Sequence, residues 1–153
     1  MNCLERYFLA GLLLLCTVCF GCAKKPPETM SAGGTLTFNG QPLANAEVRF
    51  FPMEPGLDGN YVASGVTDQD GKFTLRLVGK QESSVCVGKH QVIVMEGPLP
   101  AEARGDSEQA QTAALNYMKS LKNRPIPIKY ANLASSPLTV EIVAGQTEYK
   151  LSL

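Results

Sequence analysis

The stretch TLTFNGQPLANAEVRFFP, residues 35–52, decides the fold. Apolar and polar residues alternate over 35–38 and again over 46–50, and a period of two is typical of strands with one buried face. Asn39-Gly40 lies between the two runs, and both residues tolerate the positive φ of a tight turn. Pro52 ends the second run. This stretch therefore predicts two short strands around a tight turn.

The same period recurs in the rest of the chain. Further short strands are expected at 62–67, 73–77, 90–94, 138–142 and 149–153, with turn residues between several of them. These five join the first two to make seven strands, each with one apolar and one polar face. Such strands need two facing sheets to hide their apolar sides, so the sequence predicts a β-sandwich.

One segment departs from this pattern. Prolines bracket a polar, alanine-rich stretch near 101–124. Asp106 or Ser107 is a suitable N-cap, and the apolar side chains after it recur at helical spacing: Ala110, Ala114, Tyr117, Met118 and Leu121. The sequence leaves two interpretations open, a helix of three or four turns or a flexible loop.

The N-terminus has the organisation of an export signal. Residues 7–20 are apolar, too short a run for a membrane span, which needs about 20 residues. Gly21-Cys22 follows and resembles a bacterial lipobox, although Cys19 stands where leucine is usual. The resemblance implies cleavage between Gly21 and Cys22 and a diacylglycerol on the Cys22 thiol. Residues 1–21 are thus predicted to be a lipoprotein signal peptide and 22–33 a lipidated N-terminus and flexible tether. Signal cleavage without lipidation and a retained N-terminal anchor are the alternatives.

Composition excludes some classes of function. Fourteen Lys and Arg balance fourteen Asp and Glu, so no basic excess is available for nucleic acid and no nucleic-acid partner is expected. Of five cysteines, only Cys86 lies in the predicted domain, 34–153, so that domain forms no internal disulfide. Exported proteins can form disulfides, but this domain is expected to depend on its core.

The domain resembles a known family. TLTFNGQPLANAEVRFFP, TDQDGKFTL and VGKHQVIVM, which starts at Val87, resemble the turn and strand signatures of carboxypeptidase regulatory-like domains, and the C-terminal stretch from Ile126 resembles the ending of small exported lipoproteins of planctomycete-type bacteria. The resemblance implies an all-β, seven-stranded antiparallel Greek-key β-sandwich of the transthyretin or prealbumin type. His90 stands where the family often has an aromatic residue.

The chemically interesting residues each have a structural interpretation that is favoured. Asp68, Asp70 and Gly71 begin like a calcium loop, but the rest of the twelve-residue pattern is missing, so a turn is expected. Cys86 and His90 would lie about 13 Å apart in a continuous strand, too far for a dyad unless the chain bends. His90 is expected to be a buried imidazole without an acidic partner, with its pKa lowered.

These observations predict a non-catalytic cell-envelope lipoprotein, with no enzyme activity, cofactor or metal. Its expected partners are the membrane, through the lipid on Cys22, and an envelope protein or glycan. The residue after Cys22 is not Asp, which favours the outer over the inner membrane. The alternative is a carbohydrate-binding module, for which Tyr61 and Tyr130, expected outside the core, are candidate ligand contacts.

Overall fold

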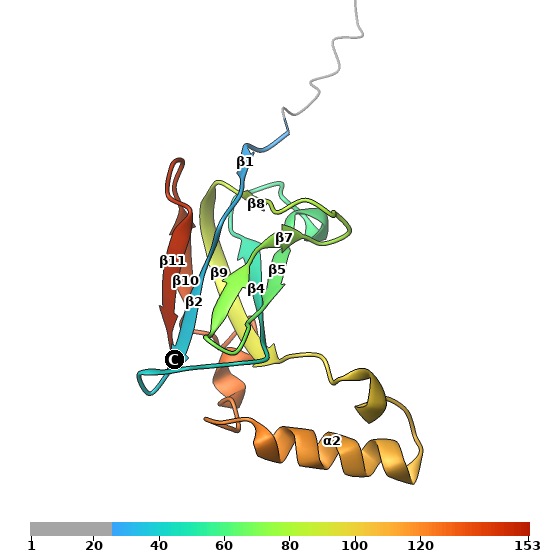
Figure 1. Cartoon of the computed structure of the whole chain (residues 1–153). Coiled ribbons are helices and arrows are strands. Elements are labelled where there is room, and N and C mark those ends of the chain that lie inside the picture. Colours follow the sequence, from blue (N-terminus) through green and yellow to red (C-terminus); the bar gives the residue numbers. More distant parts are fainter. Residues whose placement is uncertain (1–25) are drawn as a thin grey trace, which may run out of the picture.

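Two β-sheets dominate the computed structural model of the chain, which describes residues 26–153 (Figure 1). The larger sheet has the order β10 (Thr139–Ile142), β9 (Gly88–Glu96), β4 (Ala46–Pro52), β5 (Ala63–Val66) and β7 (Arg76–Leu77). In the smaller sheet, β2 (Gly33–Phe38) lies between β11 (Glu148–Ser152) on one side and β3 (Gln41–Pro42) and β6 (Lys72–Thr74) on the other. A separate pair joins β1 (Thr29–Met30) to β8 (Val85–Cys86).

The tight turn predicted after β2 is confirmed. Asn39 and Gly40 both adopt positive φ, 51° and 77°, and the chain returns with Phe38 opposite Gln41. Positive φ at both central residues matches the right-handed twist of the flanking strands. The turn therefore sets the direction in which the chain leaves β2.

The apolar faces of the two sheets meet in one core. Along β4, Ala46, Val48 and Phe50 are fully buried, whereas the residues between them are half-buried. Leu36 of β2 and Leu151 of β11 belong to the same buried cluster, as do Val92 and Val94 of β9. Because side chains alternate across a strand, this burial follows the predicted period of two and is consistent with a β-sandwich.

The predicted strand 73–77 is wrong in one respect, because the chain divides it between the two sheets. Residues 72–74 pair with β2 as β6, whereas residues 76–77 pair with β5 as β7. Leu75, fully buried, lies at the crossing. The alternation of apolar side chains continues through the crossing, so the sequence pattern gives no sign that the pairing partner changes.

The expectation of seven strands, all antiparallel, is also corrected. The described residues contain eleven strands, of which β1, β3, β7 and β8 have only two residues each. Of these, β1, β3 and β8 were not expected from the sequence, because they are too short to show a period. All paired strands are antiparallel except β11, which runs parallel to β2 with Leu151 beside Leu36. The turn after β10 carries the chain to the other sheet, where this direction lets the apolar side chains of β11 enter the core.

The insertion between β9 and β10 forms a helix, which settles the alternatives left open by the sequence. Helix α2 spans Glu108–Ser120, and the Ser107 hydroxyl accepts a hydrogen bond from the Ala110 amide at 3.1 Å. The predicted face is the less exposed one, with Ala110 buried.

The other helices of the described residues have a single turn each: η1 (Gly59–Tyr61), η2 (Ala101–Ala103) and η3 (Ile128–Tyr130). Figure 1 shows α2 beyond one end of the sheets, with β1 at the opposite end. No helix in residues 26–153 has the length and apolarity needed to cross a membrane.

Ordered structure starts earlier than the predicted boundary at Gly34. Strand β1 pairs with β8, the Val87 amide donates to the Glu28 carbonyl at 2.9 Å, and Ala32 is buried. These contacts join the chain to the sandwich from Glu28 onward, although the polar sequence 26–31 shows no apolar period.

Candidate functional site

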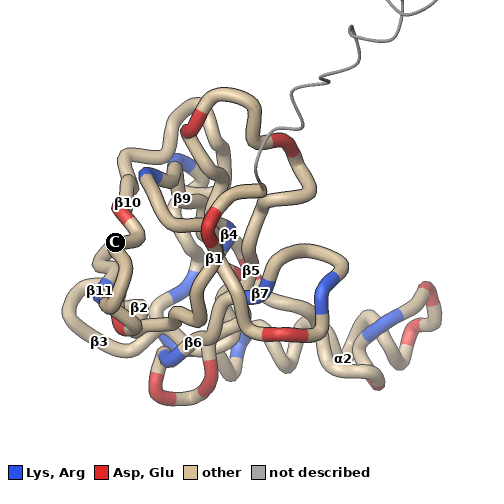
Figure 2. Tube along the Cα trace, turned by 90° about the horizontal axis from the view of Figure 1, so that it is seen from above, with Lys and Arg blue, Asp and Glu red and all other residues tan. Residues whose placement is uncertain are grey.

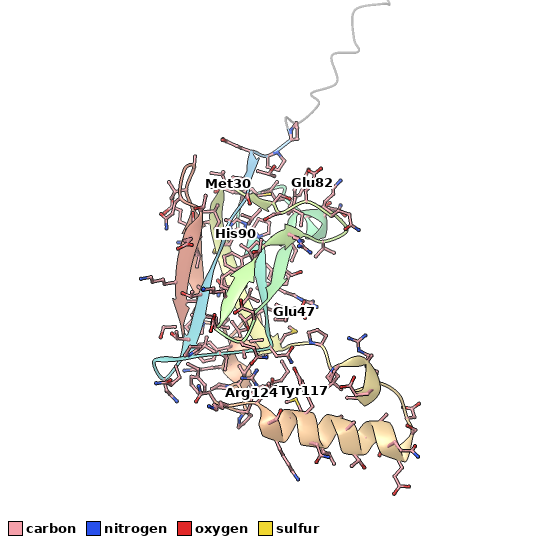
Figure 3. The ribbon with its side chains drawn as sticks, viewed as in Figure 1. Met30, Glu47, Glu82, His90, Tyr117 and Arg124 are labelled. Atoms are coloured by element: carbon pink, nitrogen blue, oxygen red, sulfur yellow. The ribbon has the colours of Figure 1, made fainter. Side chains whose placement is uncertain are left out.

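The predicted lipidation site lies outside the described residues. The described chain begins at Pro26, four positions after Cys22. The N-terminal segment joins the domain at Glu28, at the β1 end (Figure 3, where Met30 marks it).

His90 is a fully buried imidazole, as predicted. Its ring nitrogen Nδ1 lies 3.0 Å from the Gly88 carbonyl oxygen, which assigns the proton to Nδ1 in the neutral ring. The ring centroid is 6.0 Å from that of Phe50. Nε2 is buried without a hydrogen-bond partner among the described residues.

The environment of His90 lowers the pKa of its imidazole, which confirms the predicted direction. Burial is the main cause, and the Gly88 carbonyl and the Glu54 carboxylate oppose it. The expectation that His90 has no acidic neighbour is therefore wrong. Glu54 lies beside Gly88, close enough that a β-carbon on Gly88 would be 3.4 Å from Glu54 Cγ.

Cys86 and His90 do not form a nucleophilic dyad. Both are fully buried, and no hydrogen bond joins them within residues 26–153. Val87 separates β8, which carries Cys86, from β9, which carries His90, and Gly88 at the start of β9 has a φ of 121°. Burial raises the pKa of the Cys86 thiol and so disfavours the thiolate that a nucleophile needs.

The acidic stretch at 68–71 is a turn, as expected. Asp68 Oδ1 accepts from the amides of Asp70 at 2.9 Å and Lys72 at 2.8 Å, and the Asp68 carbonyl accepts from the Gly71 amide. The carboxylate is thus used to hold the turn. Across residues 26–153 the structure has no group of three or more His, Cys, Asp or Glu side chains that could hold a metal.

The two tyrosines considered as ligand contacts have different surroundings. Tyr61, at the end of η1, is half-buried against the core. Tyr130 is buried in the core cluster, with Lys129 Nζ 4.8 Å from its ring centroid, so its predicted place outside the core is wrong. Figure 1 places η1 and η3, the elements that carry these two tyrosines, toward opposite ends of the sandwich.

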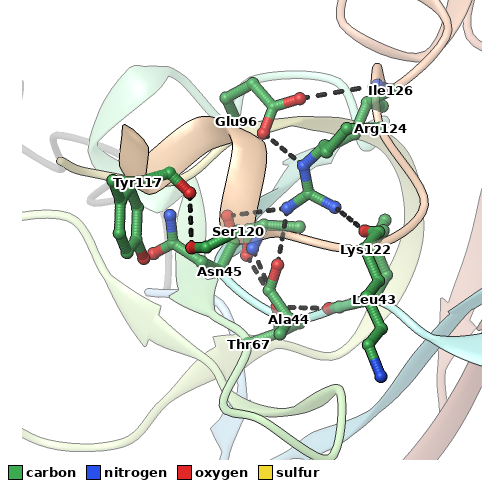
Figure 4. Close-up of polar contacts among 11 residues, drawn as sticks. Leu43, Ala44, Asn45, Thr67, Glu96, Tyr117, Ser120, Lys122, Arg124 and Ile126 are labelled. Carbon is green, nitrogen blue, oxygen red and sulfur yellow. Dashed lines mark hydrogen bonds and ion pairs between the residues drawn. The ribbon is translucent and has the colours of Figure 1, made fainter. Parts of the chain in front are cut away.

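The most connected polar group in the described structure is centred on Arg124, which the sequence did not single out (Figure 4). Its side chain is 8% exposed. Nε donates to Glu96 at 2.6 Å, and Nη2 donates to the carbonyls of Ala44 at 2.5 Å and Asn45 at 3.2 Å. Nη1 donates to the Lys122 carbonyl at 3.2 Å.

This arginine joins the insertion to the sandwich. Glu96 ends β9, where the insertion begins, and its other carboxylate oxygen accepts from the Ile126 amide at 3.4 Å. On the sandwich side, the buried Thr67 hydroxyl holds the same turn by donating to the Leu43 carbonyl at 2.6 Å. Glu96 and Ala44 are 28 and 80 residues from Arg124 in the sequence, so no local pattern could have found the group. We call Glu96, Arg124 and the Ala44–Asn45 carbonyls the arginine clamp.

Comparison with protein-family models, with curated proteins and with solved structures finds no match to the chain.

Proposed function

We propose that this chain is a non-catalytic lipoprotein of the cell envelope, anchored by lipid on Cys22, whose sandwich binds another envelope protein. The observation that carries the proposal is the Gly21-Cys22 junction at the end of an apolar run, followed directly by the polar sequence AKKPPE. Two or more acyl chains hold a protein on a membrane far longer than one does. The outer membrane is the favoured destination.

The place at which the N-terminal segment enters the domain supports an anchored role. Five residues, 23–27, lie between Cys22 and Glu28, so six Cα-to-Cα steps of about 3.3–3.6 Å reach roughly 20 Å at most. An anchor at Cys22 keeps the β1 end of the sandwich near the lipid. The α2 end, held by the arginine clamp, then faces away from the membrane, and the sheet edges between the two ends remain accessible to a partner (Figure 3, Tyr117 and Arg124).

For the fold we propose a carboxypeptidase regulatory-like domain with seven-strand Greek-key topology of the transthyretin type. The support is the family-like sequence of three segments together with their positions. Residues 35–52 form β2 to β4, residues 67–75 lead into β6, and residues 87–95 form most of β9. On this proposal the short strands β1, β3 and β8 are additions to the family core, β6 and β7 are the two parts of one family strand, and α2 is an insertion.

The test of anchoring compares Cys22→Ala with Cys86→Ala in a bacterial host that has an inner and an outer membrane. We expect the first variant to remain uncut and to lose the mass of the acyl groups on its N-terminal peptide. Cys86→Ala, in the buried core, should be processed and lipidated normally. Processing and membrane retention of Cys22→Ala at the normal level would overturn the proposal. Density-gradient separation of inner and outer membranes then tests the destination.

A further inference from the structure

The division of residues 72–77 between two sheets opens a groove at the edge of the larger sheet. Strand β7 pairs with β5 only through Ala63 opposite Leu77 and Ser64 opposite Arg76. Beyond Ser64, β5 keeps β4 on one side, with Val66 opposite Glu47, but β6 has left to pair with β2. The resulting groove has a volume of about 530 Å³ and is lined by residues 64–66, 74 and 76–80.

The groove combines apolar and cationic side chains. Val66 and Val78 are 43% and 56% exposed, and both line it. Arg76 and Lys80 also line it, and neither forms an ion pair within residues 26–153. None of the lining residues is acidic. Glu47, next to Val66 on β4, is already paired with Arg49 at 2.8 Å.

The outward face of the smaller sheet lacks the combination of exposed valines and cationic side chains that the groove has. There the strand register places Lys150, Thr35 and Lys72 in one row across β11, β2 and β6, with Glu148 and Thr74 in the next. This face also carries two lysines, but its outward side chains are Thr, Ser, Lys and Glu, without an exposed valine. This face meets the groove at Thr74, and Lys72 pairs with Asp70 at 3.9 Å. Lys72 and Lys150 themselves lie outside the groove and provide a control for the change in net charge.

We propose that the edge groove binds an extended acidic peptide segment of the envelope partner. Its carboxylates would pair with Arg76 and Lys80, and its apolar side chains would contact Val66 and Val78. The positive charge of the groove, not balanced by any lining carboxylate, favours an acidic partner. One wall is the edge of β5, and the other combines β7 with the turn at 78–80. An extended segment fits along the β5 edge, because alternate side chains of a strand point to the same side. This inference rests on the proposed interaction role and names the chemistry of the partner.

The test measures binding of a fluorescein-labelled peptide, Ser-Glu-Val-Glu-Val-Glu-Ser, to the full chain in detergent micelles by fluorescence anisotropy. We expect saturable binding that weakens as salt is added, because exposed charges are screened. The double variant R76E/K80E should weaken binding by about tenfold or more, whereas K72E/K150E, with the same change in net charge, should leave it within about twofold. The same peptide with Lys in place of Glu should bind R76E/K80E better than it binds the unchanged protein.

The apolar part of the groove has its own test. Val66→Ser and Val78→Ser should each weaken peptide binding, whereas Val143→Ser, at a similarly exposed position outside the groove, should not. Because all three side chains are about half exposed, these changes should leave the unfolding midpoint nearly unchanged. No binding to the unchanged protein, or equal loss in the groove and control variants, would overturn the inference. If the peptide does not bind but Cys22 is lipidated normally, the anchoring proposal still holds. If the peptide binds but Cys22 is not lipidated, the groove inference holds and the anchoring proposal fails.

Discussion

The sandwich and the insertion that leaves it at Gly97 are stabilised by different means. The sandwich buries apolar side chains from both sheets in one cluster. These side chains reach the interior because apolar and polar residues alternate along the strands. The insertion, residues 97–127, buries only Ala103 and Ala110 among its apolar side chains and is joined to the sandwich by the arginine clamp. Figure 2 shows residues of both charges distributed along the described part of the chain, on helix α2 as well as on the sheets and their loops. The comparison shows that two parts of one chain can be stabilised differently, the sandwich by its apolar core and the insertion by one polar group.

The largest effect is expected from Phe73→Ala in the sandwich. Phe73 is 5% exposed and its ring centroid is 6.2 Å from that of Phe50, so its removal leaves a cavity between the sheets. The free energy of unfolding should fall by about 3–5 kcal/mol, measured by chemical denaturation. The exposed neighbour Thr74→Ala should cost well under about 1 kcal/mol. Equal midpoints for the two variants would show that Phe73 does not contribute to the core as described.

A smaller and more local effect is expected from Arg124→Met at the clamp. The variant removes the hydrogen bonds of a charged group, and one such bond contributes about 1.5–3 kcal/mol to stability. It also leaves the Ala44 carbonyl without its donor. Hydrogen exchange should therefore rise in residues 97–127 much more than in β4 and β9. Arg124→Lys should be an incomplete replacement, because one ammonium group cannot reproduce the guanidinium geometry. Uniform loss of protection throughout the sandwich would contradict a local anchor.

Ser107→Ala tests whether α2 depends on its own cap. The variant removes the hydrogen bond from the Ala110 amide, and loss of an N-cap costs about 1 kcal/mol of helix stability. Amide protection in the first turn of α2 should fall, with no change in the denaturation midpoint of the sandwich. Thr112→Ala, exposed within the same helix, should increase helix stability slightly, since alanine is the better helix former. A change in the sandwich midpoint would mean that the two regions unfold together.

The smallest effect concerns His90, the polar side chain with the least exposure inside the sandwich. Because burial holds the pKa of its imidazole below the ordinary value of 6.5, the unfolded chain binds the proton more readily. Its contribution to stability is thus present above pH 6.5 and is lost as the pH falls toward the lower folded pKa. Stability of the unchanged protein should decrease between pH 7 and pH 5.5, and His90→Phe should remove that part of the pH dependence while being tolerated. An NMR titration of the imidazole giving a pKa above 7 would contradict this account.

Local features of the chain were predictable because they depend on neighbouring residues. The Asn39-Gly40 turn, the inward positions along β4 and the Ser107 cap all follow from preferences that act over two to four residues. The burial of His90 followed from its place in the alternation of β9. These features can be predicted from sequence because they do not depend on which strands pair with each other.

The pairing of strands and the clamp were decided by the tertiary structure. An alternating pattern is the same whichever sheet receives the strand, so nothing in residues 72–77 reveals that they divide between two sheets and open a groove at Val66. The parallel direction of β11 depends on where the turn after β10 delivers the chain. Arg124 is a polar residue before a proline in the sequence, and only folding brings Glu96 and the Ala44 carbonyl to its guanidinium group. Patterns of a few residues determine which side of an element is buried, whereas contacts between distant segments arise from the packing of the whole domain.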